Sequence, residues 1–568
     1  MEVFLGIDLG TTTTLVANAI ESDAGSVSVS VLPIKQNDGR GGELNIHYLP
    51  SVAYFPKDSA PIVGKEAETR GPQEDVARFV RAVKRQMGRR VLLPVVEKEP
   101  HEVSALYLEY ALREGRYSLP MADTVFTVTV PASFTTNQRA DTLVALRLAC
   151  EAAGVPYPEK DAGQLFISEP VAAALAFLNQ ELNRPKEVQT LDLSRINRVL
   201  IYDIGGGTLD LTLVFIKPLK SDVQSLADLR LNVDTIGYYN PFGGEDFDRV
   251  LAQKLHERLL ERFPELKNVI LTSPQRLGVR LQLMNLAKKI KEELSEQMDQ
   301  GGPFDFLDMS EEEPSYYYQG LIRVPGKTNP YSLEGEMTAA EYRQIVQGLL
   351  KGESRKSLVT PLRDLLKKTQ FDPARLDGLL IVGGMARLPL VAETVREFWG
   401  NDRVWVYTPP DHAVVTGAAI YSYLRRRYPG YILDEPAADA YYVRLKDRFD
   451  LILPSRDKLG EKKRYELAGD ADHIRLQIFA GEDAPGGKVN DEVLSTLIHQ
   501  GGTTVSLGKV HKKGTPVWIQ MSYAGEEGSE DHSKVPWVYI WIEKDQGQPL
   551  FRRRYNELLK GARNGKGV

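Results

Sequence analysis

Cysteine is nearly missing from this sequence of 568 residues, which contains only Cys150. A single thiol excludes an intramolecular disulfide framework and any zinc or iron–sulfur site built from several cysteines. Because Cys150 lies in the helical stretch LRLACEAAG, we expect it to be a packed small residue rather than a reactive one. The eight histidines are scattered along the chain, so a histidine-rich metal site is not expected either.

Charge of one sign and long apolar runs are also lacking. Lysine and arginine total 71 against 77 aspartates and glutamates, which gives a formal net charge of −6. Without a dominant basic block, the chain is not expected to bind nucleic acid. No run of about 18 apolar residues occurs, so no membrane span is expected. The start, MEVFLGIDLG, lacks the basic and apolar parts of a signal peptide, so we expect a cytoplasmic protein. We also expect a monomer.

Several motifs of common catalytic sites are missing as well. The chain has no GxxxxGKS/T phosphate loop, no GxSxG nucleophile elbow and no HExxH zinc motif. No GxGxxG follows the first predicted strand. P-loop nucleotide binding, serine-hydrolase chemistry, zinc-protease chemistry and dinucleotide binding are therefore not expected.

The spacing of the apolar residues changes along the chain and divides it into four segments. Residues 1–425 mix short apolar runs that end in glycine-rich turns with longer helical patterns, which predicts an α/β domain. Residues 426–440 are charged, contain two prolines and lack a period, which predicts a linker. Residues 441–548 alternate apolar and polar positions and predict a small all-β domain. Residues 549–568 are expected to form a short basic helix and a glycine-rich tail.

Two glycine-rich segments share one design: GIDLGTTTT at 6–14 and YDIGGGTLD at 202–210. In each, a predicted strand ends in an aspartate. A tight turn and then a second apolar run follow, and this order predicts a β-hairpin. Such turns let backbone N–H groups approach phosphate oxygens closely. Two turns that face each other would form a phosphate clamp, with donors from Gly10, Thr11, Thr12, Gly205, Gly206, Gly207 and Thr208.

The two aspartates and a third turn complete the pattern. Asp8 and Asp203, at the strand ends, would orient waters on Mg²⁺, an ion that keeps much of its hydration shell. In LLIVGGMARLPL, Gly383 and Gly384 end an apolar strand just before a helix, where a turn suits a nucleotide's sugar or α-phosphate. The guanidinium of Arg387 could stack on a base.

In this order, the three turns resemble those of the actin-like ATPase superfamily, which includes sugar kinases and actin. Finer motifs across about 420 residues resemble the ATPase domain of the DnaK-type, seventy-kilodalton heat-shock chaperones. The resemblance implies an actin-like, ribonuclease-H-like duplicated α/β domain that binds ATP or ADP with Mg²⁺, followed by a small β-sandwich. The motifs are VRAVKRQMGRR, FTVTVPASFTTNQRADTL, ISEPVAAALAF, PFGGEDFDRVL and PPDHAVVTGAAI.

The resemblance also implies roles for single residues. Lys84 matches the lysine on the γ-phosphate, and Glu169 matches a carboxylate near the attacking water and metal. Asp8 and Asp203 match aspartates that hold Mg²⁺ through water, and Thr208 matches a threonine near the γ-phosphate. The remaining nucleotide contacts implied are Gly244, Glu245, Asp246, Lys291, Gly383, Gly384, Met385, Arg387 and Asp411.

Three further features bear on coupling and on departures from the family. Pro131 and Arg139 match a pair thought to relay the nucleotide state. Lys288 stands where the family usually has a glutamate on the ribose. The stretch DAYYVRL replaces a leucine-rich linker, and only about 20 residues follow the last predicted strand, so no helical lid is expected. Within the β domain, we expect Trp518, Trp537 and Trp541 to belong to the sandwich core rather than to a binding cleft.

The leading interpretation is an ATP-dependent, chaperone-like protein whose lidless β domain binds unfolded peptide or a client protein. A J-domain co-chaperone and a nucleotide exchange factor are the partners that the resemblance implies. The alternatives are a nucleotide-regulated binding module for one dedicated partner with little hydrolysis, and a sugar-kinase-type phosphotransferase. A filament-forming, actin-like role is a third alternative.

Overall fold

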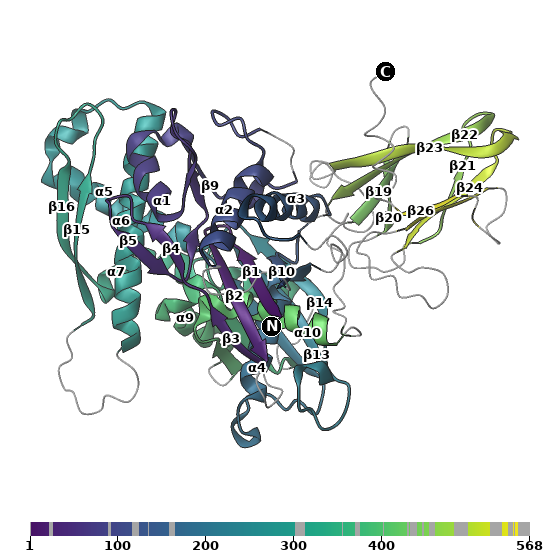
Figure 1. Cartoon of the computed structure of the whole chain (residues 1–568), viewed down its shortest axis with the longest axis horizontal. Helices are drawn as coiled ribbons and strands as arrows, with labels where there is room; N and C mark the ends of the chain where they lie inside the picture. Colours follow the sequence, from purple (N-terminus) through teal and green to yellow (C-terminus); the bar gives the residue numbers. More distant parts are fainter. Residues whose placement is uncertain are drawn as a thin grey trace. The chain divides into compact units, whose positions relative to one another are not determined.

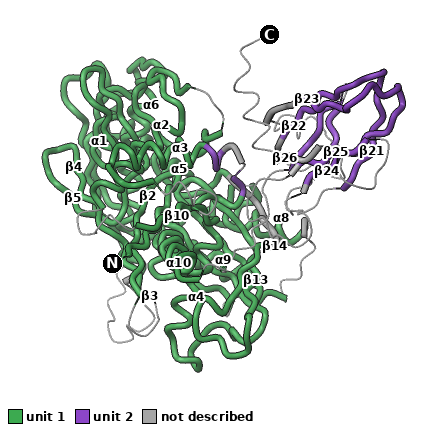
Figure 2. The backbone as a smooth tube through the Cα atoms, turned by 45° about the vertical axis from the view of Figure 1, so that its right-hand side comes forward, with its two compact units in different colours: residues 1–132, 141–434 green, residues 133–140, 435–568 purple. Residues whose placement is uncertain are grey.

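A computed structural model of the chain describes residues 2–21, 27–88, 92–115, 124–134, 136–157, 165–300, 313–354, 356–369, 375–400, 403–428, 431, 440–445, 448–453, 461–481, 498–522, 537–542, 549 and 551–554. The chain forms two compact units, which Figure 2 colours separately. Unit 1 comprises residues 1–132 and 141–434, and unit 2 comprises residues 133–140 and 435–568.

Unit 1 contains two mixed sheets that repeat one strand order. The order is β3-β2-β1-β10-β11 in the first sheet, where β6 also pairs with β2, and β14-β13-β12-β17-β18 in the second. In both, the first three strands are antiparallel and the last two continue parallel to the third. The strands are β1 (Val3–Leu9), β2 (Thr13–Glu21), β3 (Val27–Val31), β6 (Leu49–Pro50), β10 (Thr124–Val130), β11 (Phe166–Ser168), β12 (Asn197–Ile204), β13 (Leu209–Pro218), β14 (Leu229–Asn240), β17 (Gly378–Val382) and β18 (Val404–Val406).

Two helices pack between these sheets. Helix α4 (Glu169–Leu182) follows β11, α10 (Ala413–Arg427) comes after β18, and α10 contacts α4, β1, β2 and β10. Small residues allow this close packing, since a Cβ atom on Gly417 would lie 1.7 Å from the carbonyl oxygen of Ala172. One apolar cluster joins both helices to strands of both sheets. The ends of β1 and β12 are therefore held in a fixed relation.

Each sheet carries an insertion in the chain: the first lies between β3 and β10, and the second lies between β14 and β17. The first insertion holds β4 (Ile34–Asn37), β5 (Glu43–Ile46), β7 (Val52–Tyr54), β8 (Ile62–Val63), α1 (Gly64–Glu74), β9 (Phe79–Arg81), a 3-10 turn η2 (Val83–Gln86) and α2 (Pro100–Glu114). The second holds α5 (Gly244–Arg262), α6 (Ser273–Gln300), β15 (Ser315–Ile322), β16 (Tyr331–Thr338), α7 (Ala339–Lys351) and α8 (Thr360–Thr369). Figure 1 shows α1 beside α6, and the two helices are in contact.

The local signals in the sequence of unit 1 agree with the structure. Helix α4 begins after Ser168. Helix α5 buries apolar residues that recur at helical spacing from Phe247 to Leu259, and the hydroxyl of Thr338 caps α7 by accepting from the backbone N–H of Glu341. Pro389 opens α9 (Pro389–Trp399), and α3 (Thr136–Ala153) contains the buried Cys150. The mixed α/β class is confirmed. In the described part of the chain, no helix is both long enough and apolar enough to span a bilayer.

Unit 2 contains two four-stranded antiparallel sheets. The orders are β20-β19-β22-β23 and β21-β24-β25-β26. One apolar cluster takes side chains from both sheets, among them Val443, Ile478 and Ile540, so the sheets share a core. The strands are β19 (Ala440–Arg444), β20 (Phe449–Leu453), β21 (Lys463–Glu466), β22 (Ala471–Gly481), β23 (Ile498–His511), β24 (Pro516–Ser522), β25 (Trp537–Ile542) and β26 (Phe551–Arg554).

Two expectations for the carboxy-terminal region are wrong. The start of the expected basic helix is instead strand β26, which pairs with β25, so the β sheet extends past residue 548. Trp518 and Trp541 are not in the shared core, and the side chain of Trp537 lies outside the described part of the structure. Val517 and Val538 point into that core, whereas Trp518 and Trp541 pair across the opposite face of the sheet, where Lys462 lies 3.8 Å from the Trp541 ring centroid. Period-two alternation located the faces without showing which one is covered.

The linker region is also shorter than expected at its start. Helix α10 continues to Arg427, two residues into the segment 426–440, because its small and apolar side chains are buried up to Leu424. Within that segment the structure describes residues 426–428, Tyr431 and Ala440. The rest of the predicted linker lies outside the described residues.

The packing of α10 gives a first prediction. Gly417→Ala should lower the free energy of unfolding by about 1–3 kcal/mol, the usual cost of overpacking, because the backbone of α4 leaves no room for a methyl group. Gly348→Ala is the matched control, since Gly348 lies on the exposed face of α7 with nothing within 4 Å of an added Cβ. That change should stabilise by about 0.5–1 kcal/mol. Urea unfolding of the full chain measures both, and equal effects would contradict the packing argument.

Candidate nucleotide site

The two glycine-rich hairpin turns meet at the centre of unit 1. The turn between β1 and β2 closes with the N–H of Gly10 donating to the carbonyl of Thr13 at 2.9 Å. The turn between β12 and β13 closes in the same way from Gly205 to Thr208, also at 2.9 Å. A Cβ atom on Gly206 would lie 2.5 Å from the side chain of Thr12. The prediction that the turns face each other is confirmed, and a larger residue at 206 would push them apart.

The GGED turn packs against the second hairpin turn. The N–H groups of Gly244 and Glu245 donate to the carbonyls of Gly205 at 3.1 Å and of Gly206 at 2.6 Å. A Cβ atom on Gly243 would lie 2.7 Å from the carbonyl oxygen of Gly205. The backbones of the GGED turn and of the second hairpin turn can approach this closely only because glycines have no side chain. This accounts for the glycines in both motifs.

Acidic residues gather beneath the turns. Asp8 is the penultimate residue of β1, Glu169 opens α4, and Asp203 in β12 lies directly opposite Asp210 in β13. Burial and the neighbouring Glu169 raise the pKa of Asp8 to about 6, although Lys84 and a 2.6 Å hydrogen bond from Thr129 act against this. Burial and Glu169 likewise raise the pKa of Asp210 to about 7, and burial and its acidic neighbours raise that of Asp203. The site therefore holds more negative charge than its own cations neutralise.

Lys84 is the buried cation at the centre of this cluster. It lies in η2, just after Ala82, whose left-handed backbone (φ 54°, ψ 33°) turns the chain out of β9. Its ammonium forms an ion pair with the carboxylate of Glu169. Burial opposes the charged form, but Glu169 and Asp8 outweigh it and raise the pKa of Lys84. Lys84 is therefore protonated at neutral pH and joins the first insertion to α4.

Arg85 is a second cation that sequence reasoning missed. Its guanidinium donates to the carbonyl oxygen of Gly207 at 2.5 Å and lies where a Cβ atom on Gly207 would be. Its Nε is buried and has no hydrogen-bond acceptor among the described residues. A guanidinium that is held at a glycine turn and keeps one N–H available is well suited to bind an anion. The signal was available, because Arg85 directly follows Lys84 in the sequence.

Asp210 was also missed, although it lies in the motif YDIGGGTLD. Its carboxylate accepts a hydrogen bond from the hydroxyl of Thr208, one of the predicted residues. The antiparallel register places Asp210 across from Asp203, and a tight hairpin fixes that register. Counting the residues on each side of this hairpin turn would therefore have shown that Asp210 pairs with Asp203.

The predicted adenosine contacts surround the third glycine turn. Gly383 has a positive φ of 92°, and a Cβ atom there would lie 2.6 Å from Oδ1 of Asp203, so this turn touches the second hairpin. Met385 lies against Gly244, and the ammonium of Lys291 on α6 forms a 2.6 Å ion pair with Asp248.

A second ion pair lies just after the third turn. The guanidinium of Arg387 lies 2.7 Å from Oδ1 of Asp411. The third turn, the GGED turn and α6 therefore border one region beside the second hairpin. The two members of the predicted relay are described as well: Pro131 follows β10, and Arg139 on α3 donates to the carbonyl of Phe134 at 3.3 Å.

The arrangement suits a hydrated magnesium ion. Among the described residues, no three His, Cys, Asp or Glu side chains converge closely enough to hold a metal ion directly. Mg²⁺ prefers one or two carboxylates and several waters. Burial and the neighbouring carboxylates raise the pKa of Asp8 and Asp203, and a hydrated divalent cation would offset this negative charge.

The family of the chain follows from comparison with known proteins. A family model described as Hsp70 protein matches residues 99–426, and the chain belongs to this family. Members of the Hsp70 family are ATP-binding chaperones with ATPase activity. The chain is 28% identical over 421 residues to the Chaperone protein DnaK of Thermotoga neapolitana, a match that covers 74% of this chain and 59% of that protein. The chain thus spans about three fifths of the length of this curated relative.

The acidic cluster gives a second prediction, for protein without metal or nucleotide. An aspartate whose pKa rises on folding keeps a proton that the unfolded chain has lost, so stability falls as pH increases from about 4 to 7. Asp210→Asn should therefore stabilise the protein by at least about 1.4 kcal/mol, the value of one pKa unit, at pH 7.5. The gain should shrink toward pH 4. Asp222→Asn is the control, because its ion pair with Lys186 holds the pKa of Asp222 low. Melting temperatures between pH 4 and 8 measure both, and a pH-independent gain would contradict the assignment.

Proposed function

We propose that this chain binds and hydrolyses Mg·ATP in unit 1 and couples the nucleotide state to peptide or protein binding by unit 2. One observation supports the nucleotide site above all others: two glycine hairpin turns face each other over a buried lysine and a cluster of carboxylates. The family and the DnaK relative support the same reaction class.

In this proposal the phosphates of ATP lie between the two hairpin turns. Backbone N–H groups near Gly10 and Gly206 and hydroxyls of Thr11, Thr12 and Thr208 bind the phosphate oxygens. Lys84, with Arg85 beside it, stabilises charge on the γ-phosphate. Asp8 and Asp203 would hold a hydrated Mg²⁺, which would supply positive charge to offset that of the phosphates.

Hydrolysis needs a positioned water more than a covalent partner. Glu169 is fixed by its ion pair with Lys84, and Asp210 is fixed by Thr208, so both carboxylates can orient a water toward the γ-phosphate. The raised pKa of Asp210 also lets this carboxylate accept a proton from that water. Each preorganised group of this kind typically contributes about 2.7–4 kcal/mol to catalysis.

The adenosine would lie between α6 and the third glycine turn. Lys291, Gly383, Gly384, Met385 and Arg387 border this region, and Asp411 holds the guanidinium of Arg387 at its edge. The guanidinium plane suits stacking on a base. The GGED turn with Gly244 and Glu245 would join the adenosine region to the phosphate clamp.

Unit 2 is the proposed binding part. Its two antiparallel sheets share a core, and its outward face carries Trp518 and Trp541 with Lys462 and Arg464 over their rings. Unfolded peptide or one client protein is the proposed ligand. A J-domain co-chaperone and a nucleotide exchange factor are the proposed partners, by analogy with the relative named DnaK. A cytoplasmic location stays a prediction from the sequence.

One alternative has an observation in its favour. A module for a single dedicated partner with little hydrolysis would not need the family's leucine-rich linker, and this chain has DAYYVRL in that place. In the structure, this stretch enters β19, where Tyr441, Tyr442 and Val443 are buried. Because these side chains are buried within unit 2, the segment is less able to serve as a linker that transmits the nucleotide state.

A third prediction tests the hydrolytic role. Lys84→Ala should still bind ATP but slow single-turnover hydrolysis about 10²–10³-fold, since it removes one preorganised charge. Lys186→Ala is the control, because Lys186 is an exposed lysine paired with Asp222 on the surface. A Lys84→Ala rate within a few-fold of wild type would reject the role.

A fourth prediction separates the two proposed functions of unit 2. Steady-state ATP hydrolysis by the full chain should rise when an unfolded peptide is added, if peptide binding and hydrolysis are coupled. ATP hydrolysis that never responds to a panel of unfolded peptides would favour the dedicated partner. The control is Lys84→Ala, which should show neither basal nor stimulated turnover.

A further inference from the structure

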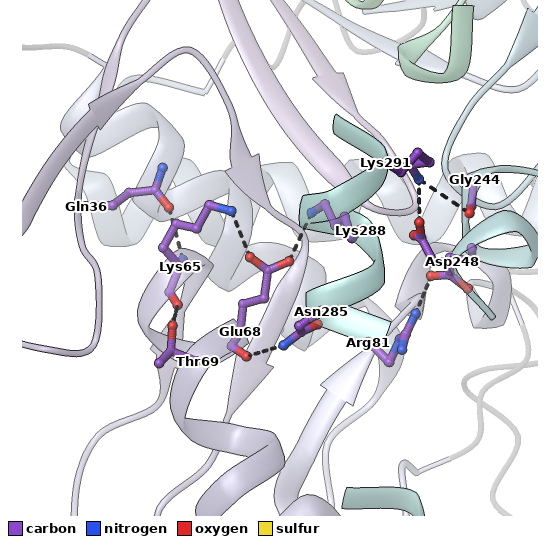
Figure 3. A network of polar contacts seen from close by, with 11 residues as sticks. Gln36, Lys65, Glu68, Thr69, Arg81, Gly244, Asp248, Asn285, Lys288 and Lys291 are labelled. Atoms are coloured by element: carbon purple, nitrogen blue, oxygen red, sulfur yellow. Dashed lines mark hydrogen bonds and ion pairs between the residues drawn. The ribbon is translucent and has the colours of Figure 1, made fainter. Parts of the chain in front are cut away.

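A buried ion pair lies beside the GGED turn, next to the proposed adenosine region. Lys291 on α6 and Asp248 on α5 approach to 2.6 Å, and their side chains are only 10% and 8% exposed. The ammonium of Lys291 also donates to the carbonyl oxygen of Gly244, the first residue of α5, at 3.5 Å. Figure 3 shows Lys291 with both partners. Sequence reasoning did not single out Asp248, although it is the last residue of the motif GGEDFD.

Three helices of the second insertion surround Asp248. Helix α5 carries it and is in contact with α6 and α7. Tyr342 on α7 is buried close by, and the charge of Asp248 adds to burial in raising the pKa of Tyr342. Burial also raises the pKa of Asp248 itself, whereas Lys291 acts against this shift. Because a buried carboxylate is costly without a cation beside it, the pair fixes the ammonium of Lys291 between α5 and α6.

Stability alone is a poor reason for such a pair. The desolvation of two charges offsets most of their attraction, and well-packed apolar residues of similar size often serve a fold equally well. The pair does give the ammonium a fixed direction. An ammonium has three N–H donors. Among the described contacts of Lys291, Asp248 and Gly244 take two of them, so one donor remains for a ligand.

The two neighbouring lysines of α6 are turned to other partners. The ammonium of Lys288 forms a 3.1 Å ion pair with Glu68 on α1, which Figure 3 also shows. The ammonium of Lys289 lies 5.9 Å from the ring centroid of Tyr316. Lys291 is therefore the lysine of this turn of α6 that is held at the GGED turn.

We propose that Asp248 is a positioning residue that holds Lys291 in place for the nucleoside part of the nucleotide. The inference rests on the proposed nucleotide site and adds a residue to its nucleoside half. Gly244 connects this half to the phosphate clamp, since its N–H donates to the carbonyl of Gly205 at 3.1 Å. Without the carboxylate of Asp248, the ammonium of Lys291 loses its fixed direction, while the two hairpin turns keep their own hydrogen bonds.

Two ligands separate the halves of the site: ADP, and pyrophosphate, which has no nucleoside. Asp248→Asn should weaken ADP binding by the full chain about tenfold and leave pyrophosphate binding within about twofold of wild type; a tenfold change is about 1.4 kcal/mol. Lys291→Met should give the same pattern. Calorimetric titration with Mg²⁺ present measures both affinities. Asp222→Asn is the matched control, because it breaks an exposed ion pair with Lys186 and should change neither affinity.

A double variant tests whether Asp248 acts through Lys291. Asp248→Asn added to Lys291→Met should cost no further ADP affinity, because the group that Asp248 positions is already missing. Lys291→Arg leaves Asp248 unchanged and keeps a cation beside it, so it should bind ADP more tightly than Lys291→Met. This comparison remains informative if Asp248→Asn does not fold.

The outcomes separate the inference from the function on which it rests. Equal losses of ADP and pyrophosphate affinity in Asp248→Asn would indicate general damage to the site and overturn the positioning role. Unchanged ADP affinity in that variant, additive losses in the double variant, or equal ADP affinities of Lys291→Arg and Lys291→Met would overturn it as well. Wild-type protein that binds neither ligand would overturn the proposed function itself.

Discussion

Four carboxylates and one buried lysine share the space below the two hairpin turns, and the rest of unit 1 is arranged around that concentration of charge. Asp8, Asp203 and Asp210 would repel one another in a low-dielectric interior, and burial raises the pKa of all three. A protein keeps such an arrangement at a cost in stability. A divalent cation bound there would offset this charge, which is the physical reason to regard the cluster as a site and not as a structural network.

The repeated strand order explains how two distant segments reach that cluster. Each sheet places a hairpin between its first two strands in sequence, and α4 and α10 pack between the sheets. The glycine of α10 at position 417 and that of β1 at position 6 leave no room for a Cβ atom, so the sheets approach closely. A fixed base of this kind preorganises the turns, and preorganisation is what electrostatic catalysis requires.

The insertions are held differently from the sheets. Apolar side chains join the sheets. The first and second insertions instead meet through ion pairs around Glu68 and Glu245, and through contacts of Val76 and Phe79 with an apolar cluster that includes Val279 and Leu286 of α6. Ion pairs between partly exposed groups are weaker than a buried apolar core and depend on charge and salt. The two sheets therefore form a rigid part that positions the hairpin turns. The two insertions are joined more weakly, so moving them apart costs less free energy.

The sequence by itself determined the elements that depend on local chemistry. Glycine turns after Asp8 and Asp203, the cap at Thr338, the helix start at Ser168 and the alternation in β24 were all readable, because turn geometry, capping and side-chain period are set by neighbouring residues. The mixed α/β class followed from them. The family resemblance supplied the roles, which remain proposals.

Only the tertiary structure decided which charges meet. The turn at Ala82 brought Arg85 to Gly207, and the packing of α1 on α6 gave Lys288 a partner in Glu68. The structure also assigned the Trp518 and Trp541 face away from the shared core and extended the sheet to β26. These pairs join residues far apart in the chain. Their contact depends on how sheets and helices pack, which no local pattern contains.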